Sequence, residues 1–393
     1  MDYSLYIHIP FCKRRCHYCD FNTYTHKESL ITAYIDALIR ELRIVSRYLK
    51  AISLRSIYFG GGTPSSVPYF EYERLMRTVS NHFSLQKSCE INLEANPGTL
   101  SKTYLEQLGE LGVNRLSIGV QSTNPLDLNR LDRIHNIDDV LDSIRLARSA
   151  GFSNINLDMI FNLPWQDLAS WQNSLSRAVD LAPEHFSLYS LIIEPGTSLY
   201  QWHQKGLIAP QNEDLEADMY ELAMEKLQKA GYQHYEISNW SKCNAARDFR
   251  SKHNLQYWLN LPYIGVGAGA HGYLGEIRTE NIATIDGYIK RMKEGFSLPY
   301  EFPKTPTTIN ALEVDRTTQM QDFMWLGLRL VSEGVSAHRF FSTYGCSMQE
   351  VFHKEIDALL ARGLVEWGGV DGENLILTKR GVMLANQVFQ QFV

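Results

Sequence analysis

Three cysteines near the N-terminus have the spacing of a metal-binding motif. Cys12, Cys16 and Cys19 lie in the stretch FCKRRCHYCDF, separated by three and then by two residues. Structural zinc sites usually have four protein ligands, so a neighbouring histidine would have to complete a zinc site here. A cubic iron-sulfur cluster has four irons that each need a ligand, and three thiolates leave one iron open. The spacing by itself leaves both kinds of site open.

The rest of the composition is typical of a soluble globular protein. The 393 residues are 44% hydrophobic and 21% charged, which is enough to bury a sizeable core. The 38 basic and 44 acidic residues give a net charge of -6, and no basic stretch is longer than residues 13–15. We therefore expect no nucleic-acid partner. Neither a long apolar run nor a signal peptide is recognisable, so we expect a cytoplasmic protein without a membrane span.

The other three cysteines stand singly along the chain. Cys89, Cys243 and Cys346 are far apart in the sequence, unlike the cysteines of a secreted disulfide framework. A lone free cysteine usually behaves as a small buried apolar residue. We expect all three to be buried and only the clustered cysteines to bind metal.

The first half of the chain alternates short apolar runs with amphipathic stretches. In the longer stretches apolar residues recur every three or four positions, as in helices that pack on one face. A β-α unit repeated in this way predicts a parallel sheet with helices outside it. The expected strands contain LYIHI at Leu5, IYFGGG at Ile57, INLEAN at Ile91, RLSIGV at Arg115, INLDMIF at Ile155 and FSLYSLI at Phe186, and the expected helices cover 30–48, 104–111, 140–150 and 168–181.

Residues that could bind a ligand or take part in chemistry stand at the carboxyl ends of these strands. They are Gly60–Gly62, Glu94, Gln121 and Asp158. A barrel gathers the carboxyl ends of all its strands around one mouth, whereas a doubly wound open sheet uses mainly its switch point. We therefore expect an α/β fold with a partial (β/α)6 TIM-like barrel, and the doubly wound sheet is the alternative.

The second half of the chain changes in composition twice. After residue 200, a helical pattern at 215–230 precedes aromatic stretches and the glycine-rich YIGVGAGAHGYLG. From residue 307, helical patterns at 321–331 and 348–362 precede two strand-like stretches around the turn VDGEN. We expect a barrel core (1–200), a barrel-covering extension (201–306) and a C-terminal winged-helix-like α+β module (307–393) that packs or docks and does not read DNA.

The cysteine cluster, with Tyr18 before its last cysteine, resembles that of the radical S-adenosylmethionine (radical SAM) superfamily. The resemblance implies a [4Fe-4S] cluster bound by Cys12, Cys16 and Cys19. It also implies that S-adenosyl-L-methionine chelates the open iron through its amino and carboxylate groups. The cofactor would then be the fourth ligand, and the partial barrel would be a radical SAM barrel.

Further positions match cofactor contacts of this superfamily. Gly60, Gly61, Gly62 and Thr63 lie one β-α unit after the cysteines, where the superfamily has its methionine-binding loop. Glycines there let the backbone approach a ligand closely. Glu94 resembles the carboxylate directed at the ribose hydroxyls. Three more contacts and an aromatic near the cofactor match the coproporphyrinogen-type branch: Gln121, Arg133, Asp158 and Tyr6.

Within that branch, the sequence resembles the HemW-type haem chaperones more than coproporphyrinogen III dehydrogenase. It shares YxHIPFC, GGGTP and GVQ with the dehydrogenase. However, the dehydrogenase has a further cysteine at the position of Phe21. It also has a long extension before the cluster, which we expect to be absent because only eleven residues precede Cys12. The chaperones also lack the further cysteine and the long extension. They have an HNxxYW element, present here as HNLQYW at His253–Trp258.

The resemblance to the chaperones implies that haem is bound as cargo and transferred to an acceptor haemoprotein. The cluster and S-adenosylmethionine would then regulate transfer or the formation of a homodimer. His253 could ligate the haem iron, beside the flat faces of Tyr257 and Trp258. Alternatively, this aromatic element could close the bottom of the barrel or pack the second domain. The alternative function is oxygen-independent radical decarboxylation of coproporphyrinogen III propionates to vinyl groups. A radical enzyme that opens or methylates the haem ring ranks third.

Overall fold

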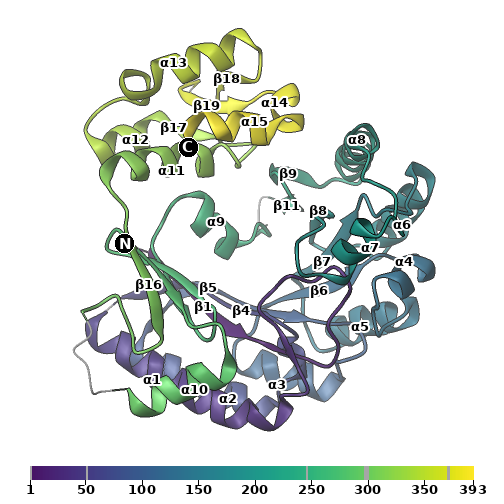
Figure 1. Ribbon diagram of the computed structural model, residues 1–393, viewed down its shortest axis with the longest axis vertical. Coiled ribbons are helices and arrows are strands. Elements are labelled where there is room, and N and C mark those ends of the chain that lie inside the picture. The colour runs from purple at the N-terminus through teal and green to yellow at the C-terminus, as the bar shows by residue number, and fades with distance from the viewer. Residues whose placement is uncertain (1, 50–51, 245–246, 296–300, 370–371) are drawn as a thin grey trace.

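A curved sheet forms the centre of the protein. The computed structural model describes residues 2–49, 52–244, 247–295, 301–369 and 372–393. Within these residues, Figure 1 shows a large sheet with helices along its outer side. Its 12 described strands, in spatial order, are β16 (Thr308–Glu313), β15 (Ile277–Asn281), β14 (His271–Leu274), β13 (Tyr263–Val266), β1 (Asp2–Ile9), β4 (Ser53–Gly61), β5 (Ser84–Ala95), β6 (Arg115–Gln121), β7 (Ile155–Phe161), β8 (His185–Ser190), β10 (Asn239–Ser241) and β9 (Gln233–Glu236).

The six strands predicted from the sequence are neighbours in this sheet and run parallel. They pair in the order β1, β4, β5, β6, β7 and β8. β13 adds a further parallel strand beside β1, and antiparallel strands extend both edges. In β6 every residue except Gln121 is buried, because a parallel strand of this kind is covered on both faces. The predicted partial barrel is confirmed.

Helices connect the parallel strands and cover the outer face of the sheet. They are α1 (Ile31–Tyr48), α2 (Tyr69–His82), α3 (Lys102–Glu110), α4 (Pro125–Arg130), α5 (Ile137–Ser149) and α6 (Leu168–Asp180). In α1, Ile35, Leu38, Leu42 and Val45 recur every three or four residues and all are buried. The sequence pattern predicted four of these helices but neither the short α4 nor α2, whose buried face includes the carboxylate of Glu71.

The chain after β8 packs around the barrel and enters its interior. α7 (Ser198–Gln204) and α8 (Glu213–Lys229) precede the edge strands, and α10 (Ile285–Glu294) packs beside α1. The short helix α9 (Lys252–Trp258) packs against β1 and β4 inside the curve of the sheet (Figure 1). None of the helices in the described ranges is long and apolar enough to cross a membrane.

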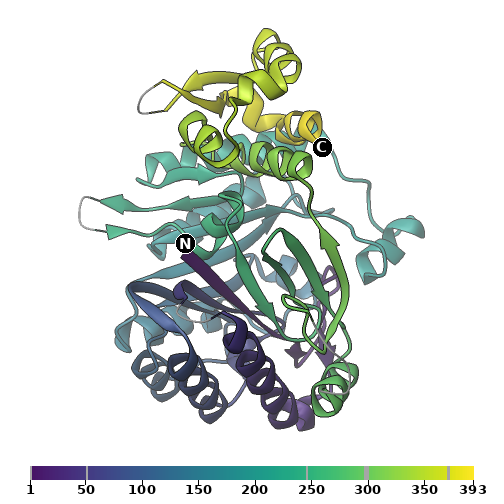
Figure 2. The same ribbon diagram turned by 90° about the vertical axis from the view of Figure 1, so that its left-hand side faces the viewer.

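The C-terminal part forms an α+β module with its own apolar core. That core contains buried residues from Met320 to Phe392, and Figure 2 shows the module above the large sheet. Helices precede a strand hairpin, as predicted, although Val370 and Asp371 of the turn lie outside the described residues. The elements are α11 (Arg316–Gly327), β17 (Val335–Ser336), α12 (Ala337–Tyr344), α13 (Met348–Ala361), β18 (Val365–Gly368), β19 (Asn374–Leu377), α14 (Lys379–Met383) and α15 (Ala385–Phe389). The three-part division at residues 200 and 306 stays a prediction.

The three single cysteines differ in burial. Cys89 is buried in β5, as expected, and Cys346 is half-buried. The expectation for Cys243 was wrong, because this residue is exposed. It lies in the two-stranded hairpin of β11 (Cys243–Asn244) and β12 (Arg247–Asp248), which pair with each other and not with the large sheet.

A buried carboxylate on α1 joins the antiparallel extension to the barrel. Glu41 has no exposed surface and accepts five hydrogen bonds. The donors are Gly267 N (2.9 Å), Asn281 Nδ2 (3.0 Å), Tyr288 Oη (2.6 Å), Thr305 Oγ1 (2.8 Å) and Thr307 Oγ1 (2.7 Å). These donors come from the loop after β13, from β15, from α10 and from the segment before β16. One side chain therefore satisfies buried donors from four parts of the chain.

We predict that Glu41→Ala lowers the free energy of unfolding by about 3 kcal/mol or more, because several buried donors lose their acceptor together. Urea denaturation followed by circular dichroism measures this change. The matched control is Glu110→Ala, since Glu110 is exposed at the end of α3. Equal stability of the two variants would contradict the anchoring role of Glu41.

Candidate functional site

The clustered cysteines lie on one loop, residues 11–25, which we call the Cys loop. Its two ends are joined because β2 (Phe11–Cys12) pairs in parallel with β3 (Tyr24–Thr25). Its middle is anchored where the backbone N–H of His17 donates to the carbonyl of Leu131 at 3.2 Å. The backbone therefore holds the loop at the carboxyl ends of the parallel strands.

The glycine loop after β4 holds the start of the Cys loop through backbone contacts. Gly62 N donates to Ile9 O at 2.9 Å, and Thr63 N donates to Phe11 O at 2.8 Å. A Cβ atom at Gly62 would lie 2.7 Å from Phe11 O, so no larger residue fits there. Gly61 has a φ of +119°, which side-chain-bearing residues rarely adopt. The glycines predicted to approach a ligand are thus also required for two loops to touch.

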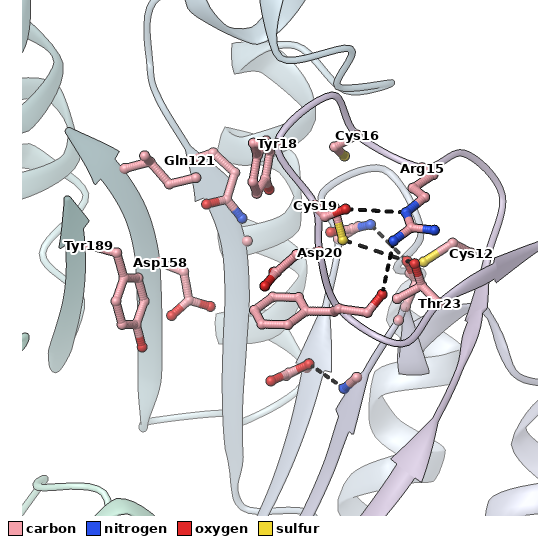
Figure 3. A pocket seen from close by; sticks show the side chains of 18 of the residues that line it. Cys12, Arg15, Cys16, Tyr18, Cys19, Asp20, Thr23, Gln121, Asp158 and Tyr189 are labelled. Atoms are coloured by element: carbon pink, nitrogen blue, oxygen red, sulfur yellow. Dashed lines mark hydrogen bonds between the residues drawn. The ribbon is translucent and has the colours of Figure 1, made fainter. Parts of the chain in front are cut away.

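The Cys loop and the strand ends surround a cavity of about 440 Å³. Figure 3 shows the cysteines on one side of this cavity and Asp158 with Tyr189 on the other. Three of the predicted site residues, Tyr6, Gly60 and His253, are not part of its lining. The predicted residues that do line it are Cys12, Cys16, Cys19, Gly61, Gly62, Thr63, Glu94, Gln121, Arg133 and Asp158.

Each thiol of the Cys loop has a polar neighbour. Thr63 Oγ1 donates to Cys12 Sγ at 3.5 Å, and Arg133 Nη1 donates to Cys16 Sγ at 3.5 Å. Cys19 Sγ lies 4.0 Å from Thr23 Oγ1. Burial raises the pKa of Cys12 to about 11, although the hydrogen bond from Thr63 acts in the opposite direction. Without a bound cation this thiol is therefore mostly protonated at neutral pH.

Three thiols on one wall of the cavity are a donor set that fits a cubic cluster with one open iron. Among the described residues, no group of three or more His, Cys, Asp and Glu side chains is placed to hold one metal ion. With Zn–S bonds of about 2.3 Å, tetrahedral zinc would require thiolates about 4 Å apart. A cubic cluster binds each thiolate through a different iron, so its ligands need not converge on one point.

Two carboxylates lie deep in the cavity. Glu94 accepts hydrogen bonds from Tyr58 Oη at 2.7 Å and from Gly61 N at 3.0 Å. Burial raises the pKa of Glu94 to about 7, and the Asp158 carboxylate adds to the rise, while the Tyr58 hydrogen bond opposes it. Asp158 accepts from Ser117 Oγ at 2.9 Å, and burial raises its pKa also. Ionising both groups here is costly unless a ligand supplies donors or positive charge.

Arg133 and Gln121 occupy the remaining wall. Arg133 Nη2 donates to Asn96 Oδ1 at 2.7 Å and to Gly119 O at 2.8 Å. Its Nε is buried without a hydrogen-bond partner among the described residues, so one strong donor remains to be satisfied. Gln121, at the end of β6, has a φ of +63°, a strained conformation for a residue other than glycine. The set of donors and carboxylates fits a zwitterionic nucleoside such as S-adenosylmethionine.

The cavity also contains polar residues that the sequence analysis did not select. Tyr58, Asn96, Ser117 and Tyr189 line it. Side chains two positions apart on a strand point to the same face. Ser117 and Gly119 in β6 follow this alternation and both line the cavity, whereas a register shift separates Gly119 from Gln121.

The HNxxYW element forms α9, beneath the cavity. His253 is 1% exposed. Its Nδ1 lies 2.8 Å from Ser56 Oγ, and its Nε2 lies 2.9 Å from Tyr257 Oη. Burial lowers its pKa to about 3, so the ring is neutral and both nitrogens are engaged. Its ring packs 4.9 Å from that of Tyr58, which in turn lines the cavity. The haem-ligand role of His253 stays a prediction, and the arrangement seen here matches the alternative in which the element closes the barrel bottom.

Comparisons with known proteins agree with this architecture. The family model of the Radical SAM superfamily matches residues 6–177, and that of the HemN C-terminal domain matches residues 314–384. A solved structure titled "Coproporphyrinogen III oxidase (HemN) from Escherichia coli is a Radical SAM enzyme" superimposes with a TM-score of 0.83. It covers 99% of this chain and 89% of that one at 22% identity, a likeness that shows the fold alone.

Curated relatives are similar along nearly the whole chain. "Heme chaperone HemW" of Bacillus subtilis is 40% identical over 393 residues, with 99% of each chain covered. "Radical S-adenosyl methionine domain-containing protein 1, mitochondrial" of Danio rerio is 30% identical and covers 97% of this chain and 83% of its own. "Heme chaperone HemW" of Lactococcus lactis is 36% identical, with 99% of this chain and 97% of its own covered. The chain therefore belongs to the HemW haem chaperone family of the radical SAM superfamily.

Proposed function

We propose that this protein binds haem and transfers it to an acceptor haemoprotein. The observation that carries the proposal is the similarity to proteins named haem chaperones, which extends over 99% of the chain for the Bacillus subtilis relative. Phe21 also favours a haem chaperone over coproporphyrinogen III dehydrogenase, because the dehydrogenase has a further cysteine at this position of the Cys loop.

We further propose that Cys12, Cys16 and Cys19 hold a [4Fe-4S] cluster and that S-adenosylmethionine occupies the cavity beside it. When bound, such a cluster supplies an electron donor and an iron with an open position. Glu94 would accept hydrogen bonds from the ribose hydroxyls of the cofactor, and the guanidinium of Arg133 would lie in the wall beside it. The backbone N–H of Thr63 donates to Phe11 O and holds the start of the Cys loop, and its hydroxyl donates to Cys12 Sγ.

The function can be tested with one anaerobic, cluster-reconstituted preparation. Titration with haem should give a saturable change in the Soret band, and mixing the loaded protein with an apo-cytochrome should move that band to the acceptor. Conversion of coproporphyrinogen III to protoporphyrinogen IX by the same preparation would instead establish the dehydrogenase. A preparation that neither binds nor releases haem would refute the proposed function.

Cluster content should depend on three of the six cysteines. We predict that Cys12→Ala, Cys16→Ala and Cys19→Ala each abolish the visible absorbance and most of the bound iron after reconstitution, because the other thiols lie outside the cavity lining. Cys89→Ala, Cys243→Ala and Cys346→Ala are matched controls and should retain the iron of the wild type. Loss of iron in any of these controls would contradict the three-ligand assignment.

Binding of S-adenosylmethionine should tighten as pH rises through 7. An ionised carboxylate is the better acceptor for ribose hydroxyls. With a pKa of about 7, Glu94 is mostly protonated at pH 6 and mostly ionised at pH 8. The dissociation constant should therefore fall by up to about tenfold more in the wild type than in Glu94→Gln over this range. Isothermal titration calorimetry of both proteins measures this, and parallel pH profiles would exclude the role of Glu94.

A further inference from the structure

We propose that haem docks on the rim of the cavity, against an apolar surface of Phe21, Tyr189 and Ile192, with its propionates directed to Arg15. This inference rests on the proposed haem-binding function and assigns a place to the cargo. We call this surface the haem rim.

The haem rim gathers exposed apolar side chains around one cavity. Phe21 is 62% exposed, Tyr189 44% and Ile192 68%, and all three line the cavity. A single exposed apolar residue on a protein surface needs no explanation. Three of them around one concave site form an apolar binding surface for a ligand.

The three side chains come from opposite walls of the cavity. Phe21 belongs to the Cys loop, which follows β1, whereas Tyr189 and Ile192 lie at the end of β8 and just after it. β1 and β8 are the first and last of the six parallel strands predicted from the sequence, and four strands lie between them in the sheet. Figure 3 shows Tyr189 across the cavity from the cysteines. A flat macrocycle inserted between these walls would meet an apolar side chain on each of its two faces.

The wall on the β8 side continues into buried apolar residues. Leu191 and Ile160 line the cavity and are buried in a small cluster separate from the main core. Tyr18, which also lines the cavity, packs against that cluster from the Cys loop. An apolar ligand at the haem rim would therefore bury its inner edge against a surface that is already apolar.

The charge at the rim suits the two propionate carboxylates of haem. Arg15 is exposed and lines the cavity. In the part of the chain that the structure describes, it donates to the backbone carbonyls of Cys19 (3.2 Å) and Phe21 (3.4 Å) and has no carboxylate partner. Its neighbour Arg14 already pairs with Asp132 at 2.9 Å. A guanidinium binds carboxylates in a two-pronged geometry, so Arg15 can receive a propionate.

A carboxylate on the β8 side favours one orientation. Glu194 follows β8 and lines the cavity, as does Asp20 on the Cys loop. Glu194 would repel propionates on the β8 side, whereas Arg15 attracts them to the Cys loop. We therefore expect the propionate edge of haem to face Arg15 and the vinyl-bearing edge to face the β8 side.

The test compares haem binding by rim variants of the full-length, cluster-reconstituted protein. Phe21→Ala and Ile192→Ala should each raise the dissociation constant for haem about tenfold, as truncation of a central interface contact typically does. Arg15→Gln should raise it similarly for haem but by less than about twofold for haem dimethyl ester, which has no propionate charge. Iron content and S-adenosylmethionine affinity, measured in parallel, establish that the Cys loop of each variant is intact.

Exposed residues away from the cavity serve as matched controls. Phe70→Ala on α2 replaces a 53% exposed phenylalanine, Ile309→Ala on β16 a 51% exposed isoleucine, and Arg145→Gln on α5 an exposed arginine. All three should bind haem as the wild type does. If the wild type binds haem and the rim variants match it, the location is refuted while the proposed function stands. If the wild type gives no saturable Soret change, both fall.

Discussion

The site depends on a backbone contact that only glycine permits. Gly62 lies so close to the Cys loop that a Cβ atom would stand 2.7 Å from Phe11 O and 3.0 Å from Ile9 O. The two backbone hydrogen bonds made by Gly62 and Thr63 then fix the start of the Cys loop over the strand ends. Because the thiols follow directly from this point, main-chain geometry sets where the Cys loop begins.

The same geometry explains why polar groups can be kept away from bulk water. The Cys loop closes over Glu94, Asp158 and Arg133, which share one cavity. Hydrogen bonds within the protein satisfy some of the acceptors of the two carboxylates: Tyr58 donates to Glu94, and Ser117 donates to Asp158. The raised pKa of Glu94 shows that ionisation still costs free energy. A ligand that brings a positive charge or well-placed hydroxyl donors would lower this cost.

Local spacing and strand order made most of this site predictable. The cysteines are close in sequence, and Glu94, Gln121 and Asp158 lie on consecutive parallel strands, whose carboxyl ends must meet. How deeply each residue is buried was not predictable, because a sequence motif does not show which other segments cover its residues. For this reason the sequence did not show that His253 lies outside the cavity lining, and Cys243 was expected to be buried although it is exposed. Strand β13 was not predicted, because its four residues lie in a glycine-rich stretch and show no clear alternation of apolar and polar side chains.

The position of α9 argues for a supporting role of the HNxxYW element. His253 bridges Ser56 of β4 and Tyr257 of its own helix, while Trp258 lies 4.3 Å below the guanidinium of Arg329, which follows α11. The element thus connects the C-terminal module with the strand that bears Tyr58, the donor to Glu94. Ligating haem through His253 would break a buried hydrogen bond, at a cost of about 1 to 3 kcal/mol for the group left unsatisfied. An accessible apolar rim above the cavity imposes no such cost, so this comparison favours the proposed haem rim over His253 as the docking place and is consistent with α9 as a support below the cavity.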